Sequence, residues 1–228
     1  MTAKAKSILM YVLGMILCPL GVALCANAGF GVSMIEAPVY VAFLKFSAYS
    51  NYITYGSMEY VLQAIVLILL CITVKKFKAK YLLSFLTAVI FGFILDGWRL
   101  VVGAEVYGTM PIRIIACAFG ILITSFAVSC FFRTELPQEV WELFVKEFSE
   151  LRHFEMTKVK FVYDFSSLLV GIILMFIFFH KFDINAIGPA TIIMTFANAP
   201  FILLFGKAID KVIPVKNEDD NNRVDKND

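Results

Sequence analysis

Acidic side chains stand inside apolar stretches of this sequence, where an ionised group is costly. Glu59 lies about two turns into one such stretch, and Gln63 follows four residues later, so both fall on one face of a helix. Asp164 lies at a similar depth in a later stretch. An ionised group at the centre of a membrane helix costs roughly 2.5–3.5 kcal/mol. Each residue is therefore either part of a solute or proton pathway, or a shallow group that reaches the membrane surface or helix-start amides.

Another acid, Glu36, follows a pair of glycines in the segment ANAGFGVSMIEAPV (26–39). Ser33 and Glu36 stand three residues apart, as in a capping box, and Pro38 falls within the second turn of the helix they would start. The glycines allow the chain to reverse sharply. We expect residues 33–46 to form a short helix in the outer leaflet or at the mouth of the bundle. Glu36 is either its cap or a functional group.

Two other polar groupings have structural interpretations. Asp96 and Arg99 are three residues apart near the outer end of an apolar stretch and are predicted to form a structural ion pair. Thr191, Thr195 and Asn198 form a polar stripe, which suits hydrogen bonding between helices or a place in the site. The candidates for a substrate path are Glu36, Glu59, Gln63, Asp164 and Asn198.

Signals of enzymatic chemistry are absent from the sequence. It contains no HExxH motif, no phosphate loop and no cluster of His and Cys. The five cysteines lie in apolar runs without a CxxC pair, which is typical of buried free thiols. We therefore predict no catalytic residue, no metal, no cofactor and no nucleic-acid partner.

The elements that must hold these residues are apolar stretches of membrane-spanning length. The chain is 60% hydrophobic and 17% charged, whereas soluble domains are about half apolar and a quarter charged. A bilayer core of roughly 30 Å needs about twenty apolar residues in a helix. Six such stretches are predicted, near residues 8–27, 52–74, 80–101, 111–131, 158–180 and 187–209.

The basic residues predict the orientation. With the N-terminus inside, most Lys and Arg, including the run KKFKAK (75–80), fall on the inner side. We expect a multi-pass protein of a bacterial cytoplasmic (inner) membrane with both termini cytoplasmic. A signal peptide cleaved near residues 26–28 is the alternative, but the first apolar run has span length and its loss would disturb the charge bias.

Two halves of the chain resemble each other. LGMILCPLGVALC (13–25) and FGILITSFAVSCF (119–131) share their glycine and small-residue pattern, and each precedes a short segment carrying Pro. Three spans per half would place the copies in opposite orientations. We predict an all-α, polytopic membrane helix bundle of about six transmembrane helices, built as two inverted three-helix repeats, each with a short extra helix.

The predicted repeats and tail divide the chain into three parts. The second repeat carries a cytoplasmic amphipathic segment whose acidity favours contact with the protein's own basic inner loops. The tail is polar and Asn-rich, which is typical of disorder. The parts are residues 1–106, residues 107–211 with the amphipathic segment 133–157, and the tail 212–228.

Two motifs resemble a known family. ALCANAGFGVSMIEAPVYVAF (23–43) is similar to the first-span signature of the YczE/YyaS/YitT family of bacterial integral membrane proteins. IGPATIIMTFANAPFI (187–202) is similar to its closing motif, with Gly188, Thr191 and Pro200 at matching places. The chain departs from the family where a charged segment replaces the glycine-rich loop of the second half. The resemblance implies topology more than function.

Function is predicted at the level of a class. The leading hypothesis is a transporter or flux facilitator for a small solute or an ion, with the lipid bilayer as its surroundings. The second is a non-catalytic membrane protein that assembles or regulates another complex, with a protein partner docking on segment 133–157. The third is a substrate-capturing subunit of a multi-component importer.

Overall fold

A computed structural model describes residues 3–103, 107–134 and 136–212. Within these ranges the chain forms eight helices and no strand, and six of the helices are long and apolar enough to cross a membrane. The six are α1 (Ala3–Ala28), α3 (Tyr55–Val74), α4 (Lys80–Val101), α5 (Met110–Phe131), α7 (Met156–Phe179) and α8 (Pro189–Val212). The short helices are α2 (Ala37–Phe46) and α6 (Val140–Arg152).

The predicted all-α, six-span fold is confirmed, and every predicted span end lies within five residues of a helix end. The predicted tail, from residue 213 onward, and the predicted repeat boundary at residue 106 lie outside the described residues.

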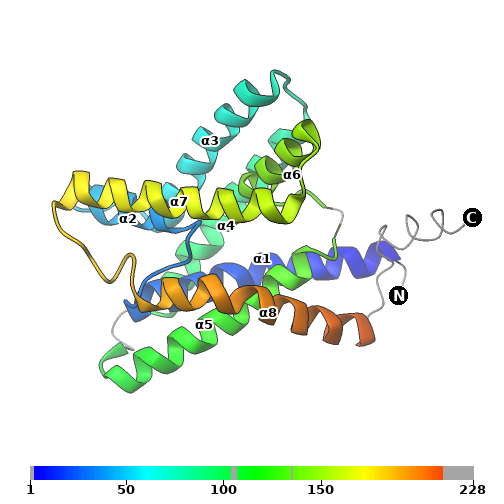
Figure 1. Ribbon diagram of the computed structural model, residues 1–228. Coiled ribbons are helices and arrows are strands. Elements are labelled where there is room, and N and C mark those ends of the chain that lie inside the picture. The colour runs from blue at the N-terminus through cyan, green and yellow to red at the C-terminus, as the bar shows by residue number, and fades with distance from the viewer. Residues whose placement is uncertain (1–2, 104–106, 135, 213–228) are drawn as a thin grey trace, which may run out of the picture.

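Helices α1, α5 and α8 lie in one layer of the molecule (Figure 1). α1 packs along α5, and α5 packs on α8. The contact between α1 and α5 needs residues without a side chain. A Cβ atom at Gly21 would overlap the Thr124 side chain, and one at Gly120 would lie 2.6 Å from Cys25 Sγ. These glycines therefore allow the two backbones to approach closely.

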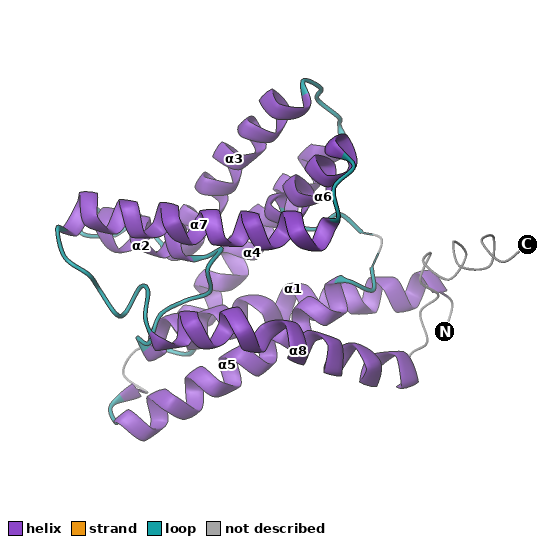
Figure 2. Cartoon of the chain, viewed as in Figure 1, coloured by secondary structure: helices purple, strands orange, loops and turns teal. Residues whose placement is uncertain are grey.

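The remaining helices form a second group around the two short ones (Figure 2). α2 packs on α7 and α3, while α6 packs on α3, α7 and α4. If α5, α6, α7 and α8 correspond in order to α1, α2, α3 and α4, three contacts have counterparts. α1–α4 corresponds to α5–α8, α2–α7 to α6–α3, and α2–α3 to α6–α7. Two inverted repeats would give this pattern, although in the described residues α7 and α8 do not pack as α3 and α4 do. The division into repeats stays a prediction.

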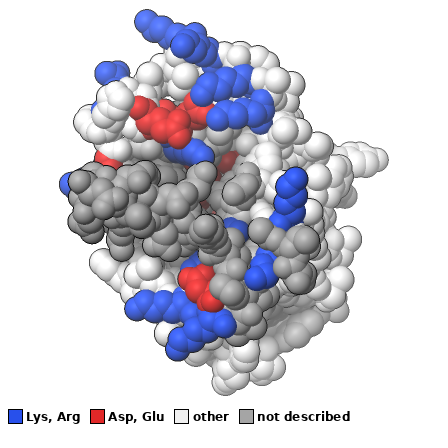
Figure 3. Space-filling model, turned by 90° about the vertical axis from the view of Figure 1, so that its right-hand side faces the viewer, with Lys and Arg blue, Asp and Glu red and all other residues white. Residues whose placement is uncertain are grey.

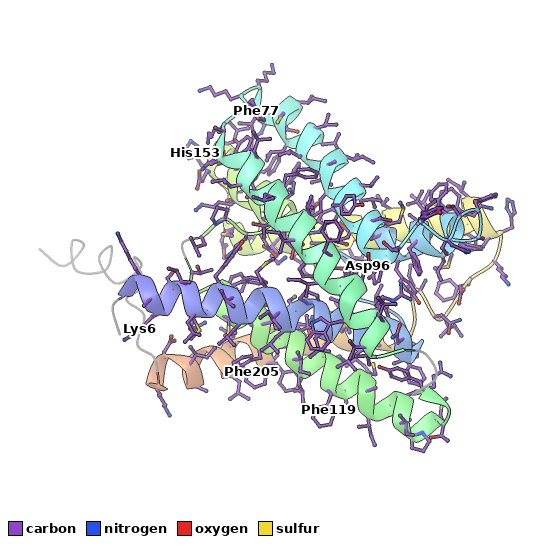
Figure 4. All side chains as sticks on the ribbon, turned by 180° about the vertical axis from the view of Figure 1, so that it is seen from behind. Lys6, Phe77, Asp96, Phe119, His153 and Phe205 are labelled. Carbon is purple, nitrogen blue, oxygen red and sulfur yellow. The ribbon has the colours of Figure 1, made fainter. Side chains whose placement is uncertain are left out.

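Basic side chains gather at one end of the bundle. Figure 4 shows Lys6, at the start of α1, at the same end as Phe77 and His153, which lie in the turns before α4 and α7. Figure 3 looks onto this end and shows Lys and Arg around two acidic groups. The segregation follows the charge bias in the sequence, and the assignment of this end to the cytoplasm stays a prediction.

The short helix α2 exists, but the predicted capping box is wrong. The helix begins at Ala37, after a turn in which the Ala37 amide donates to the Ser33 carbonyl at 3.0 Å. Glu36 makes no side-chain cap, because its carboxylate accepts a hydrogen bond from the Tyr55 hydroxyl instead. Residues 37–42 are all buried, so α2 is an inserted helix and not a surface loop.

Helix α6 is held to the basic turn between α3 and α4 by one buried acid, as the acidity of the segment predicted. Glu147 is 3% exposed and contacts Lys78, Lys80 at 2.8 Å and the Tyr81 hydroxyl at 2.8 Å. Burial alone would raise the pKa of Glu147, but the hydrogen bonds from both lysines and the tyrosine lower that pKa to about 2.

Replacing Glu147 with Gln is expected to lower the free energy of unfolding in detergent by about 1 kcal/mol, because both lysines are half exposed and screened by solvent. The depressed pKa means that the contribution of Glu147 is present above the ordinary carboxyl pKa and is lost as the pH falls towards about 2. Thermal unfolding across this range measures both effects. Glu150→Gln, an exposed change on the same helix, is the control and should alter neither.

The crossing of α3 and α4 is a backbone contact between two glycines. A Cβ at Gly56 would overlap the Gly92 carbonyl, and one at Gly92 would lie 2.6 Å from the Gly56 carbonyl oxygen. Neither neighbour is a flexible side chain, so a larger residue here forces the helices apart.

Gly92→Ala is therefore expected to destabilise the protein by about 1–3 kcal/mol, because its methyl group meets backbone atoms. Gly97→Ala, on the same helix with open space around it, should be neutral or slightly stabilising. Thermal unfolding of both variants in one detergent provides the comparison. Equal effects would show that the close crossing is unimportant for stability.

Candidate functional site

A hydrogen-bonded network of polar side chains lies inside the bundle around Gln63. Glu59 and Gln63 are fully buried on one face of α3, as their spacing predicted. The Gln63 Nε2 group donates to Glu59 Oε1 at 2.8 Å and to Glu139 Oε2 at 2.6 Å. Its Oε1 atom accepts from the Val140 amide at 2.8 Å, and Trp141 Nε1 donates to Glu59 Oε1 at 2.8 Å. One side chain thus ties α3 to the start of α6.

Glu36 joins this network from the opposite side. It is 6% exposed and accepts a hydrogen bond of 2.8 Å from the Tyr55 hydroxyl. Its carboxyl also lies near the Glu59 carboxyl, whose charge raises the pKa of Glu36. Glu59 Oε2 has no hydrogen-bond partner in the described residues. Two neighbouring carboxyl groups favour the state in which one of them carries a proton.

Glu139 completes the cluster and was not among the predicted path residues, because the acidity of its segment was expected to serve contacts with basic loops. Glu36 immediately precedes α2 and Glu139 immediately precedes α6, so each is the residue that enters the short helix of its half. The alignment of the two short segments carried this signal. We call Glu36, Glu59 and Glu139 the carboxylate cluster.

The carboxylate cluster holds like charges without a direct basic partner. No Lys or Arg forms an ion pair with any of its three members within the described ranges. Burial raises the pKa of Glu36 well above its usual range, and Glu59 raises it further. Burial also raises the pKa of the half-buried Glu139, again with a contribution from Glu59. Such groups retain a proton at higher pH than an exposed carboxyl does.

Two of the predicted path residues lie outside the carboxylate cluster. Asp164 lies 3.4 Å from Lys160, whose ammonium group also contacts Glu142 at 2.8 Å. Asn198 accepts a hydrogen bond of 3.1 Å from Ser125, which links α8 to α5. The structure therefore brings together Glu36, Glu59 and Gln63, and it places Asp164 and Asn198 elsewhere.

The predicted ion pair between Asp96 and Arg99 is not formed. Asp96 accepts hydrogen bonds from the Thr54 hydroxyl and from the Gly56 amide at 2.9 Å, where α4 crosses the start of α3 (Figure 4). It therefore satisfies the amino end of α3. Arg99 instead lies over the Phe43 ring, 4.5 Å from its centroid. The close glycine crossing turns the carboxylate towards the helix start.

Within the described ranges, no group of three or more His, Cys, Asp or Glu side chains is arranged to hold a metal ion. The prediction of a protein without metal or cofactor stays a prediction.

Comparison with known proteins identifies a family but no activity. The sequence profile of a family described as a family of unknown function (DUF6198) matches residues 5–207. No curated protein and no solved structure matches the chain. The resemblance to the YczE/YyaS/YitT family stays a prediction.

The carboxylate cluster is expected to keep a proton above the pH range in which an ordinary carboxyl loses it. Infrared spectra of the protein in lipid should show a band from a protonated carboxyl that is lost as the pH rises, because burial raises the pKa of Glu36 and Glu139. Glu36→Gln and Glu139→Gln should each reduce this band. The control, Glu155→Gln, changes an exposed residue and should leave it unchanged. A pH-independent spectrum would contradict the expectation.

Proposed function

The chain belongs to the DUF6198 family, and we propose that it is a proton-coupled transporter of a small solute. The observation that carries this proposal is the carboxylate cluster, which lies among helices long and apolar enough to span a membrane and has no ion-pair partner in the described part of the chain. Ionisable residues at membrane depth are costly, and in transporters they mark proton and ion pathways. A purely structural role would be served better by apolar residues or by a matched ion pair.

The polar network extends towards both ends of the bundle. On the outer side, the Glu36 carboxyl bonds to Tyr55, whose ring lies 5.1 Å from that of Tyr40. Tyr40 lines a cavity at that end. On the inner side, Glu139 lies close enough to Glu142 and Lys160 for their charges to influence its pKa. A proton entering from either end therefore has acceptor groups along most of the route.

Protonation of the carboxylate cluster would change how the helices hold together. The Gln63 amide and the Trp141 indole donate to carboxylate oxygens, and such bonds are about twice as strong as those to neutral acceptors. Binding a proton weakens them and loosens α6 from α3. Coupling between proton binding and helix movement is what alternating access requires.

The alternative of a partner docking on segment 133–157 has less support. Val140, Trp141 and Val145 of α6 are buried within the molecule, and α6 packs on three of the protein's own helices. The apolar face that a partner would use is therefore occupied. No observation specifically favours the importer subunit.

Proteoliposomes with an entrapped pH indicator test the proposal. In wild-type vesicles, a mixture of amino acids, sugars and organic acids added outside is expected to cause solute-dependent proton entry under an imposed membrane potential. Glu59→Gln should reduce this signal to that of protein-free vesicles, because the central proton acceptor is lost. Proton entry should also fall as the outside pH is raised, since coupling needs the protonated cluster.

Glu150→Gln is the matched control, since it makes the same chemical change at an exposed site. It should transport like the wild type. Unchanged, pH-independent transport by folded Glu59→Gln protein would remove the carboxylate cluster from the mechanism.

A further inference from the structure

A cavity of about 290 Å³ opens at the outer end of the bundle. Five segments meet there: the end of α1, α2, the end of α4, the start of α5 and the connection from α7 to α8 (Figure 1). The volume is at the lower end of the range for small-molecule pockets. Its polar lining consists of Asn27, Tyr40, Arg99, Arg113, Asp183 and Asn185.

The charge of this outer cavity is positive. It contains two guanidinium groups and a single carboxylate, Asp183. Neither Arg99 nor Arg113 forms an ion pair with an acid in the described part of the chain. Asp183 Oδ1 instead accepts hydrogen bonds from the backbone and side-chain amides of Asn185, each at 2.9 Å. The carboxylate is thus directed to its own turn and not to an arginine.

Arg99 is held in position while its terminal donors stay available. Its guanidinium lies 4.5 Å from the Phe43 centroid and 5.4 Å from the Tyr55 centroid. Its Nε donates to Asn27 Oδ1 at 3.4 Å, and its two terminal nitrogens have no hydrogen-bond partner in the described residues. A guanidinium oriented in this way presents the pair of parallel donors that a carboxylate or phosphate accepts.

Arg113 has a different part in the same cavity. Its Nε donates to the Ala28 carbonyl at 2.7 Å, and its Nη2 donates to the Gly29 carbonyl at 3.3 Å. It therefore fixes the chain reversal after α1, where Gly29 has a φ of 68°. Its full charge remains beside the cavity, because carbonyl groups do not neutralise it.

We propose that the outer cavity binds a small soluble anion bearing a carboxylate or phosphate group, with Arg99 as its principal ligand. Asn27 and Asn185 would add amide contacts, and the charge of Arg113 would favour entry of the anion. Only the further step, that this anion is the solute carried with protons, rests on the proposed function.

Isothermal titration of the full-length protein in an uncharged detergent tests binding directly. Succinate and inorganic phosphate are the two anionic probes, and 1,4-butanediol is the neutral counterpart of succinate. We expect saturable binding of at least one anion and none of the diol. Absence of saturable binding by both anions, or equal binding of the diol, would overturn the proposal.

Three variants assign the binding to the outer cavity. Arg99→Gln should weaken it about tenfold, because a charge-assisted pair is lost. Lys181→Gln removes an exposed charge that does not line the cavity and should leave affinity unchanged. Asp183→Asn should tighten binding severalfold by removing the only acid among the described lining residues. If Arg99→Gln does not fold, the affinity for the anion is measured on Arg99→Lys and Asp183→Asn instead. Unchanged affinity in both variants would overturn the proposal.

A lipid headgroup carries the same phosphate chemistry as a soluble anion. A second experiment distinguishes the two sources. Nanodiscs with and without phosphatidylglycerol are compared, and binding of that lipid through Arg99 without binding of either soluble anion would overturn the proposal. Glu59→Gln protein should bind the anion as the wild type does. Loss of transport with binding intact would therefore contradict the proposed function alone.

Discussion

The bundle depends on one buried amide that bridges two acids. Gln63 donates to Glu59 and Glu139 and accepts from the backbone at the start of α6, so its polar atoms are used within the protein. Without it, the Glu139 carboxyl and the Val140 amide would lose their hydrogen-bond partner, each at a cost of about 1–3 kcal/mol, and Glu59 would keep only the Trp141 indole. The position of the start of α6 follows from this side chain.

Much of the fold could be predicted because the bilayer imposes it. Span length, backbone hydrogen bonding and charge bias are properties of local sequence, and they located α3, α4 and α5 to within a few residues. The pairing of Glu59 with Gln63 was equally local. The cluster was only partly predictable, because Glu139 reaches it through the tertiary fold. Asp96 shows the converse. Its carboxylate does not pair with the arginine three residues later, because it accepts a hydrogen bond from the start of α3, which the contact of Gly56 with Gly92 brings close.

The two short helices are alike where they begin and differ in what surrounds them. Each is entered through a glutamate, and both glutamates reach Glu59 or its partner Gln63 from opposite ends. One short helix is apolar and buried, while the other is amphipathic and held by Glu147 to basic residues. The two glutamates that precede the short helices thus meet at one set of side chains, although the outer surfaces of the two helices differ.

The glycine crossing of α3 and α4 has a mechanical consequence. Where backbone rests on backbone there is no flexible side chain to yield, so these two helices are expected to move as one rigid arm. α7 and α8 lack such a contact, and large apolar side chains along both of them face outward. In a bilayer, their separation is therefore expected to depend partly on the surrounding acyl chains.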